Sequence, residues 1–233
     1  MFVKLGILGG MGAIAGLYFN QRLIEKTFAK NDLENIETIL YTKPDIPDRT
    51  CAILNNGISP LTKINEGIKS LEEQGCTHIV IACNTAHHFF DEFIVKKANL
   101  INIVNETVKY LKSKGLKKPL LLGTNGTFQA GVYDKYCQKF DISLIKLTKQ
   151  NQEIIMKAIY SVKAGKSFEA INFFYKSFLN SEKLQKKYGF DSVIYACTEI
   201  SYIFGKDSFF EKIPSFDPIE IVCQQIIDIH NKS

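Results

Sequence analysis

Short apolar runs rich in β-branched residues alternate with amphipathic stretches along the whole chain. Such runs predict buried strands, and the stretches between them predict helices that cover a sheet. The predicted strands are Val3–Gly9, Ile36–Thr42, His78–Cys83, Ile101–Val104, Pro119–Gly123, Ile142–Leu147, Ser192–Ala196 and Ile213–Phe216. The predicted helices are Ala13–Lys30, Pro60–Gln74, His87–Val95, Thr107–Lys114, Phe128–Lys139, Gln152–Ala164, Phe168–Lys186 and Ile219–His230. This alternation is typical of βα units, so we expect an α/β fold with mainly parallel sheets.

The pattern also repeats within the chain. Cys197 follows Cys83 by 114 residues, and the same shift maps the glycine loop "LGGMG" at residues 8–12 onto "LGTNG" at residues 122–126. A shared offset indicates two copies of one α/β unit. We therefore expect two similar half-domains related by a pseudo-twofold axis, with the active site in the cleft between them. The first is predicted to comprise residues 1–102 and 211–233, and the second residues 103–210.

Polar residues gather where the predicted strands end. Ligands of parallel sheets bind at the carboxyl ends of the strands. The segments at such ends are Gly9–Gly12, Cys83–Thr85, Gly123–Thr127 and Cys197–Glu199. Taken singly, each cysteine is most simply a buried strand-end residue. As a symmetric pair facing one cleft, Cys83 and Cys197 suit the removal of a proton from one face of a carbon and its return to the other face.

Composition narrows the class of protein. The chain has 233 residues, of which 45% are hydrophobic, and a net charge of +5 that comes from scattered lysines. No apolar run reaches the roughly 18 residues of a membrane span. No basic run with interleaved aromatic residues indicates a nucleic-acid groove. The N-terminal run resembles a weak signal peptide, but its glycines are better explained by a strand-to-loop turn. We expect a cytoplasmic protein with neither a membrane nor a nucleic-acid partner.

Cysteine and arginine usage add two expectations. Six cysteines without a Cys-x-x-Cys motif predict reduced thiols and no metal site. Cys83 and His87 could form a metal pair, but nothing completes the ligand set; His87 could also tune the thiol or merely lie at the surface. Only two of the 29 basic residues are arginine, Arg22 and Arg49. Because arginine is a planar two-pronged donor, Arg49 becomes a candidate for binding a carboxylate.

Five motifs together resemble the aspartate/glutamate racemase superfamily, and within it the aspartate racemase branch. They are "GILGGMG" (6–12), "PDIPDRT" (44–50), "ACNTAH" (82–87), "LGTNGT" (122–127) and "ACTEI" (196–200). The resemblance implies racemisation of an acidic amino acid by two cysteines, without a cofactor, in a two-domain α/β fold that often forms a homodimer. Ala13 and Ala196 replace a proline and a glycine of the family pattern. The Asp-Ser pair of cell-wall glutamate racemases is missing from the first glycine loop, which disfavours glutamate as the sole substrate.

The resemblance also assigns roles to residues. Cys83 and Cys197 become the catalytic pair, and Arg49 lies against the acidic side chain of the substrate. A family lysine near the end of the Gln152–Ala164 helix corresponds to Lys166 or to Lys163; Lys166 is carried forward as the contact. The other implied substrate contacts are Met11, Asn84, Thr85, Thr127, Thr198 and Glu199.

The proposed reaction makes specific demands. An ordinary cysteine is mostly thiol at neutral pH, so the site must stabilise one thiolate while the opposite cysteine stays protonated. Donors must also stabilise the charge that grows on the α-carboxylate; Thr124 and Asn125 are further candidates beside Asn84, Thr85 and Thr127. Glu199 could accept from the substrate ammonium, or merely complement a helix N-terminus.

Four alternatives remain. "GMGAIA" at residues 10–15 fits a loose nucleotide-binding pattern, but no acidic residue follows the next strand to hold a ribose. A related lyase or isomerase of the same fold, such as a decarboxylase or maleate isomerase, would use one or both cysteines, as would a racemase for another amino acid. A non-catalytic amino-acid sensor would need neither of the two cysteines. The intact pair and Arg49 favour an aspartate racemase.

Overall fold

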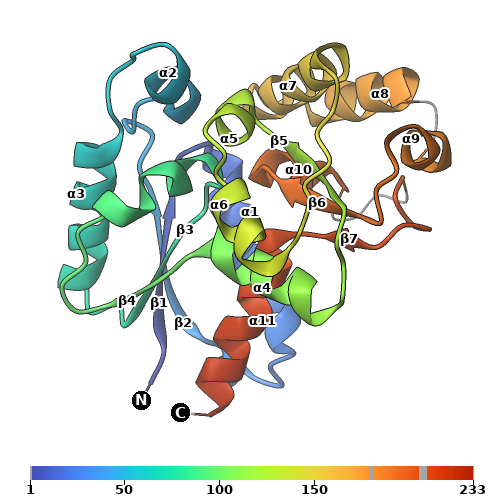
Figure 1. Ribbon diagram of the computed structural model, residues 1–233. Coiled ribbons are helices and arrows are strands. Elements are labelled where there is room, and N and C mark those ends of the chain that lie inside the picture. Colours follow the sequence, from blue (N-terminus) through green and yellow to red (C-terminus); the bar gives the residue numbers. More distant parts are fainter. Residues whose placement is uncertain (1, 179–180, 205–208, 233) are drawn as a thin grey trace.

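Two parallel sheets form the framework of the protein, which was analysed as a computed structural model that describes residues 2–178, 181–204 and 209–232 (Figure 1). In the first sheet the strand order is β2-β1-β3-β4, and in the second it is β5-β6-β7. The strands are β1 (Lys4–Gly9), β2 (Glu37–Thr42), β3 (His78–Ile81), β4 (Asn99–Ile101), β5 (Pro119–Gly123), β6 (Ser192–Ala196) and β7 (Ser215–Phe216). All paired strands are parallel, as the alternating pattern predicts.

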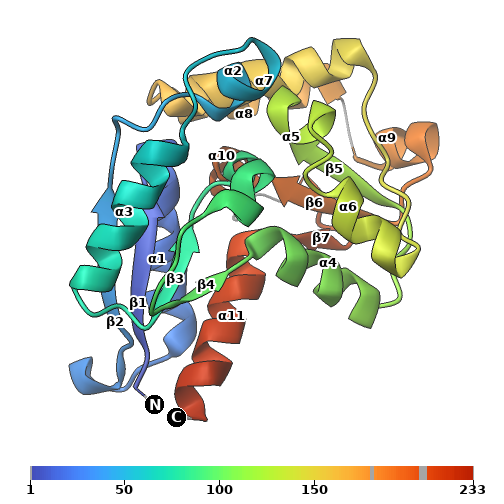
Figure 2. The ribbon, with the colours of Figure 1, turned by 60° about the vertical axis from the view of Figure 1, so that its left-hand side comes forward.

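Helices cover both sheets. Figures 1 and 2 show α3 on the outer side of the first sheet, α7 and α8 beside the second sheet, and α11 between the two sheets. The α-helices are α1 (Ala13–Thr27), α2 (Arg49–Leu54), α3 (Leu61–Glu73), α4 (Ile103–Ser113), α5 (Asn125–Gln129), α6 (Asp134–Cys137), α7 (Lys149–Lys163), α8 (Ser167–Phe178), α9 (Ser181–Tyr188), α10 (Thr198–Phe204) and α11 (Pro218–Asn231). Short 3₁₀ helices span Asp32–Glu34, Thr85–Glu92 (η2) and Gln138–Phe140.

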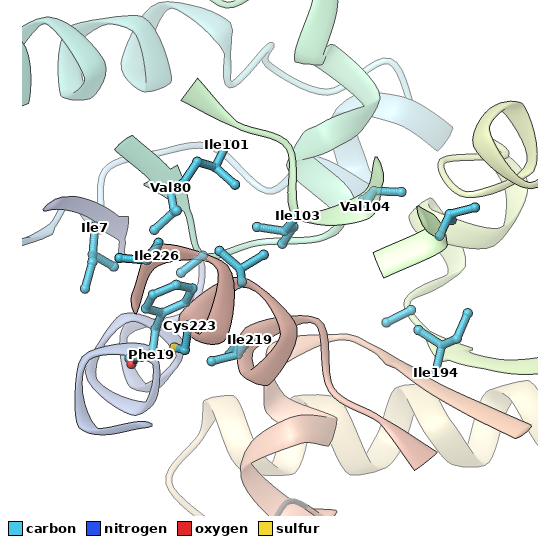
Figure 3. Close-up of a cluster of buried hydrophobic side chains, with 14 of the residues drawn as sticks. Ile7, Phe19, Val80, Ile101, Ile103, Val104, Ile194, Ile219, Cys223 and Ile226 are labelled. Atoms are coloured by element: carbon cyan, nitrogen blue, oxygen red, sulfur yellow. Dashed lines mark hydrogen bonds between the residues drawn. The ribbon is translucent and has the colours of Figure 1, made fainter. Parts of the chain in front are cut away.

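One apolar cluster joins the two sheets. Figure 3 shows Phe19 of α1 beside Cys223 of α11, with Val80 of β3 and Ile194 of β6 in the same cluster. Successive side chains of a strand point to opposite faces. Val80 therefore enters this shared cluster, whereas its neighbour Ile79 packs in a separate cluster with α3. Each sheet thus has one face in a common core, which holds the two halves together.

The internal repeat is confirmed by the sheets. The order β1-β3-β4 recurs as β5-β6-β7, with both cysteines following the central strand of the three. The predicted strand Ile142–Leu147 is wrong as a strand: only Ile145 forms a parallel bridge, to Leu120 of β5. In the second sheet, this bridge lies beside β5 in the position that β2 has beside β1 in the first sheet. The predicted division places residues 211–233 in the first half-domain. In the structure, residues 215–216 of that segment form β7, which pairs with β6 of the second sheet.

Several other predicted elements differ from the structure in their bounds or type. The run at residues 101–104 was predicted as a strand, but Asn102 accepts a hydrogen bond from the Asn105 N–H and starts α4 there. The predicted helix Phe128–Lys139 is divided where Gly131 adopts a left-handed φ of 60°. Residues 87–95 begin as the 3₁₀ helix η2 rather than as an α-helix. The predicted helix over 168–186 corresponds to α8 and α9, with residues 179–180 outside the described part.

Asp217 fastens three helices to one another. Its carboxylate accepts hydrogen bonds from the Tyr18 hydroxyl of α1 (3.3 Å), the Ser201 hydroxyl of α10 (2.7 Å) and the Ile219 N–H of α11 (2.9 Å). Burial raises the pKa of Asp217 to about 7, although these donors lower it. Asp217 therefore connects the helices, and its carboxyl gains or loses a proton near neutral pH.

The raised pKa of Asp217 predicts pH-dependent stability. A carboxyl whose pKa rises on folding stabilises the folded state fully below its unfolded pKa of about 4 and loses that contribution towards pH about 7. Over this window we expect this group to lower the free energy of unfolding by up to about 1.4 kcal/mol per pH unit. Asp217→Asn should remove this contribution to the slope, as measured by urea unfolding at several pH values. An identical slope in the variant would contradict the assignment.

Candidate active site

A narrow pocket opens between the carboxyl ends of the two sheets. Cys83, after β3, and Cys197, after β6, both line it, so each half contributes one thiol. All six cysteines of the chain are free. The lining residues are Met11, Asp48, Arg49, Thr50, Cys83, Asn84, Thr85, Thr124, Lys163, Cys197, Thr198 and Glu199. The pocket therefore brings together most of the residues that the sequence singled out.

The first glycine loop is shaped by a close backbone contact. Gly10 has a φ of 97°, and a Cβ there would lie 2.3 Å from the Lys43 carbonyl oxygen. Only glycine tolerates both conditions. The loop consequently turns Met11 towards the pocket, where its carbonyl accepts a hydrogen bond from Arg49 Nη2 at 2.9 Å.

Some hydrogen-bond donors of Arg49 hold the surrounding backbone, and another is left without a partner among the described residues. Its Nη1 donates to the carbonyls of Ile46 (3.3 Å) and Pro47 (3.0 Å), which holds the segment before α2 in place. Its Nε is buried and has no hydrogen-bond partner among the described residues. A buried donor of a charged group without a partner is costly. The unfilled Nε therefore suits an anionic ligand such as a carboxylate.

Cys83 lies in a turn that His87 stabilises. The Nδ1 atom of His87 donates to the Cys83 carbonyl (2.8 Å), and its Nε2 accepts from the Ile103 N–H at the start of α4 (3.4 Å). Burial lowers the pKa of His87 to about 4, so the ring is neutral. Both ring nitrogens are occupied, and the imidazole therefore acts as a joint between η2 and α4 rather than as a metal ligand.

Hydroxyl and amide groups line the pocket near Cys83. The hydroxyls of Thr85, Thr124 and Thr127 form a triangle with oxygen separations of 2.8, 3.0 and 3.1 Å. This triangle joins the two halves, because Thr85 follows β3 whereas Thr124 and Thr127 follow β5. Asn84 Nδ2 is a second buried donor for which the described residues provide no partner. Together these groups can donate to a carboxylate.

On the opposite side, Glu199 and Lys163 surround Cys197. The Cys197 thiol donates to Glu199 Oε2 at 2.9 Å, while the Gly12 N–H donates to Oε1 at 3.1 Å. Burial raises the pKa of Cys197 well above its usual value, Glu199 raises it further, and Lys163 opposes the effect. Burial lowers the pKa of Lys163, but Glu199 and Cys197 raise it above its usual value on balance. Lys163 is therefore a cation beside a protonated thiol.

Three predicted contacts lie elsewhere. Lys166 is 61% exposed and approaches Glu169 at 3.8 Å, so Lys163 and not Lys166 lies at the pocket. The reason is the left-handed Gly165, which ends α7 and turns the chain away. Thr127 lies behind the lining, within the hydroxyl triangle, and the Asn125 side chain does not line the pocket.

Asp48 and Thr50 line the pocket but were not singled out from the sequence. The Asp48 side chain accepts from the Cys51 N–H and caps α2. An aspartate is a preferred N-cap residue, and this signal could have revealed the short helix.

A larger hollow of about 1130 Å³ lies between α4, α11 and the segment around β7. No cysteine lines this hollow among the described residues, and several of its charged groups are paired, as in Glu106 with Lys109 and Glu220 with Lys26. The catalytic candidate is therefore the smaller pocket.

Among the described residues, no three His, Cys, Asp or Glu side chains gather as a metal site requires. No described helix is both long and apolar enough to cross a bilayer.

Comparison with known proteins gives similarity over nearly the full chain. The Asp/Glu/hydantoin racemase family model matches residues 8–226. The aspartate racemase of Picrophilus torridus is 34% identical, with a TM-score of 0.87 over 98% of this chain and 94% of that one. The broad-specificity amino-acid racemase RacX of Bacillus subtilis (strain 168) is 25% identical over 231 residues, 97% of each protein. A glutamate racemase of Francisella tularensis in complex with D-glutamate shares the fold, with 16% identity and a TM-score of 0.65 over 99% of this chain and 81% of that one.

Proposed function

The chain belongs to the Asp/Glu/hydantoin racemase family and is accordingly an isomerase, and we propose that it interconverts L- and D-aspartate without a cofactor. The observation that carries this proposal is the pair Cys83 and Cys197, which line one pocket from different halves of the fold. An acid/base group on each face of a carbon allows its proton to leave from one face and return to the other.

The two thiols have different surroundings, which suggests their order of action. Cys197 donates to Glu199 and has a raised pKa, so it rests as the thiol. In the direction that starts from this state, a Cys83 thiolate takes the Cα proton while the Cys197 thiol protonates the opposite face. After this step Cys83 carries the proton and Cys197 the charge, and the reverse reaction starts from that state. Lys163 stabilises the negative charge on Cys197.

Glu199 is proposed to act on Cys197 rather than on the substrate ammonium alone. Its Oε2 already accepts from the thiol and its Oε1 from the Gly12 N–H. The carboxylate therefore keeps the sulfur oriented towards the pocket. It also ties the first glycine loop to the start of α10.

Unpartnered donors support an acidic substrate. Arg49 Nε and Asn84 Nδ2 are buried and have no hydrogen-bond partner in the part of the chain that the structure describes, and both residues line the pocket. Arg49 would bind the side-chain carboxylate, while Asn84 and the pocket-lining hydroxyls of Thr85 and Thr124 would bind the α-carboxylate. Glutamate is the second candidate substrate, and the relative named as having broad specificity makes a wider range worth testing.

A chiral assay tests this proposal. Dialysed protein with a thiol reductant is incubated with L-aspartate, L-glutamate, L-asparagine or L-alanine, and the enantiomers are separated. We expect D-aspartate to form fastest. Faster racemisation of a neutral amino acid would overturn the substrate assignment, and no racemisation of any amino acid would overturn the activity.

Lys163 and Lys166 offer a matched pair of variants. We expect Lys163→Gln to lower kcat/KM for aspartate by about 10²-fold, because the cation beside Cys197 and Glu199 is lost. Lys166→Gln removes the same charge from an exposed position and should leave kcat/KM within about twofold. Equal losses in both variants would contradict the role of Lys163.

A further inference from the structure

Tyr133 is the largest side chain that is fully buried in the described part of the chain. It lies between α5 and α6 and packs in the apolar cluster that joins the sheets. Its hydroxyl donates to Asn84 Oδ1 at 2.6 Å. Since Asn84 follows β3 of the first sheet, this hydrogen bond connects the two halves next to the pocket.

The hydrogen bond holds the Asn84 amide with its oxygen facing Tyr133. An amide has one acceptor oxygen and one donor nitrogen. Tyr133 donates to the oxygen, and burial raises the pKa of Tyr133 well above its usual value, so the phenol keeps the proton that it donates. The Nδ2 of Asn84 is buried and has no partner among the described residues. The only polar group of the side chain that is still unfilled is therefore a donor, in a residue that lines the pocket.

We propose that Tyr133 is a positioning residue for the racemase site: by holding Asn84 Oδ1, it keeps Nδ2 available to the α-carboxylate of the substrate. This inference rests on the proposed function. As the Cα proton leaves, negative charge grows on the carboxylate, and a donor that is already oriented then contributes most. A rotated amide would instead present its oxygen to the carboxylate and repel it.

Coupled variants test the proposal, with kcat and KM for aspartate as readouts. We expect Tyr133→Phe to lower kcat/KM about tenfold, mainly through kcat, because an oriented donor is lost in the transition state. Asn84→Ala should lower it by about 10²-fold. Tyr133→Phe added to Asn84→Ala should cost less than about twofold more, since the tyrosine acts through the amide. Asn84→Asp keeps the acceptor but lacks the donor and adds a negative charge that repels the substrate carboxylate, so it should lower kcat/KM at least as much as Asn84→Ala.

The chain contains a matched control pair. The Tyr136 hydroxyl accepts from Asn102 Nδ2 at 2.7 Å, and neither residue lines the catalytic pocket. Tyr136→Phe should therefore leave kcat/KM within about twofold. A loss as large in Tyr136→Phe, or the same factor for Tyr133→Phe with and without Asn84, would mean that the tyrosine acts through packing and would overturn the proposal. Wild-type protein that racemises no amino acid would instead overturn the proposed function itself.

Discussion

Replacing either cysteine of the pocket with serine is expected to abolish most of the activity. A serine hydroxyl is too weak an acid to form the anion, so Cys83→Ser or Cys197→Ser should each lower the rate of aspartate racemisation by about 10²–10⁴-fold. Each variant retains one thiol. We therefore expect solvent exchange of the Cα proton to survive for one enantiomer only, with opposite enantiomers for the two variants, as measured by proton NMR in deuterated buffer.

Cys51 provides the control for this experiment. It is exposed on α2 and does not line the pocket, although it lies two residues from Arg49. Cys51→Ser should retain the wild-type rate. Full activity in both Cys83→Ser and Cys197→Ser would rule out the two-base mechanism.

Arg49→Ala is expected to have the second-largest effect. The loss of a charge-assisted contact to the side-chain carboxylate should raise KM for aspartate about 10- to 100-fold. Arg49→Lys should restore little, because an ammonium cannot reproduce the two-pronged contact. Steady-state kinetics with aspartate, compared with a neutral amino acid that the wild type also turns over, measure this selectivity.

Two controls separate binding from folding in this experiment. Arg49 also holds the carbonyls of Ile46, Pro47 and Met11, so thermal unfolding must be followed in the same variants. Arg22, the other arginine, pairs with Glu25 and Glu220 away from the pocket, and Arg22→Ala should leave KM unchanged. An equal loss for aspartate and for the neutral amino acid would argue that Arg49 serves the loop alone.

Much of the fold follows from local sequence patterns. The apolar runs of β1, β3, β5 and β6 are long and bounded by glycine or polar residues, and each forms a parallel strand as predicted. Gly115 and Gly165 end the preceding helices in left-handed conformations. The repeat located both cysteines at equivalent strand ends. Short elements were harder, since α2 and α10 have only six and seven residues and too few turns to show helical periodicity.

The parts of the site that were missed depend on long-range packing. Choosing between Lys163 and Lys166 requires the direction in which α7 meets the pocket, which a three-residue spacing does not reveal. Tyr133 belongs to an aromatic segment with no polar motif, and its role arises only because the fold brings it to Asn84. The contact between Glu199 and Cys197 could not be predicted from the sequence either. A glutamate at the start of α10 is equally well explained by the helix dipole.

The most direct test of the central claim is the early time course of L-aspartate in deuterated buffer, with deuterium at Cα measured separately in each enantiomer. No cofactor is added, and a thiol reductant is present. If Cys83 and Cys197 serve opposite faces, the D-aspartate formed first carries deuterium while the remaining L-aspartate keeps its proton. Deuterium entering the remaining L-aspartate as fast as the D-product would mean that one base serves both faces, and would contradict the account.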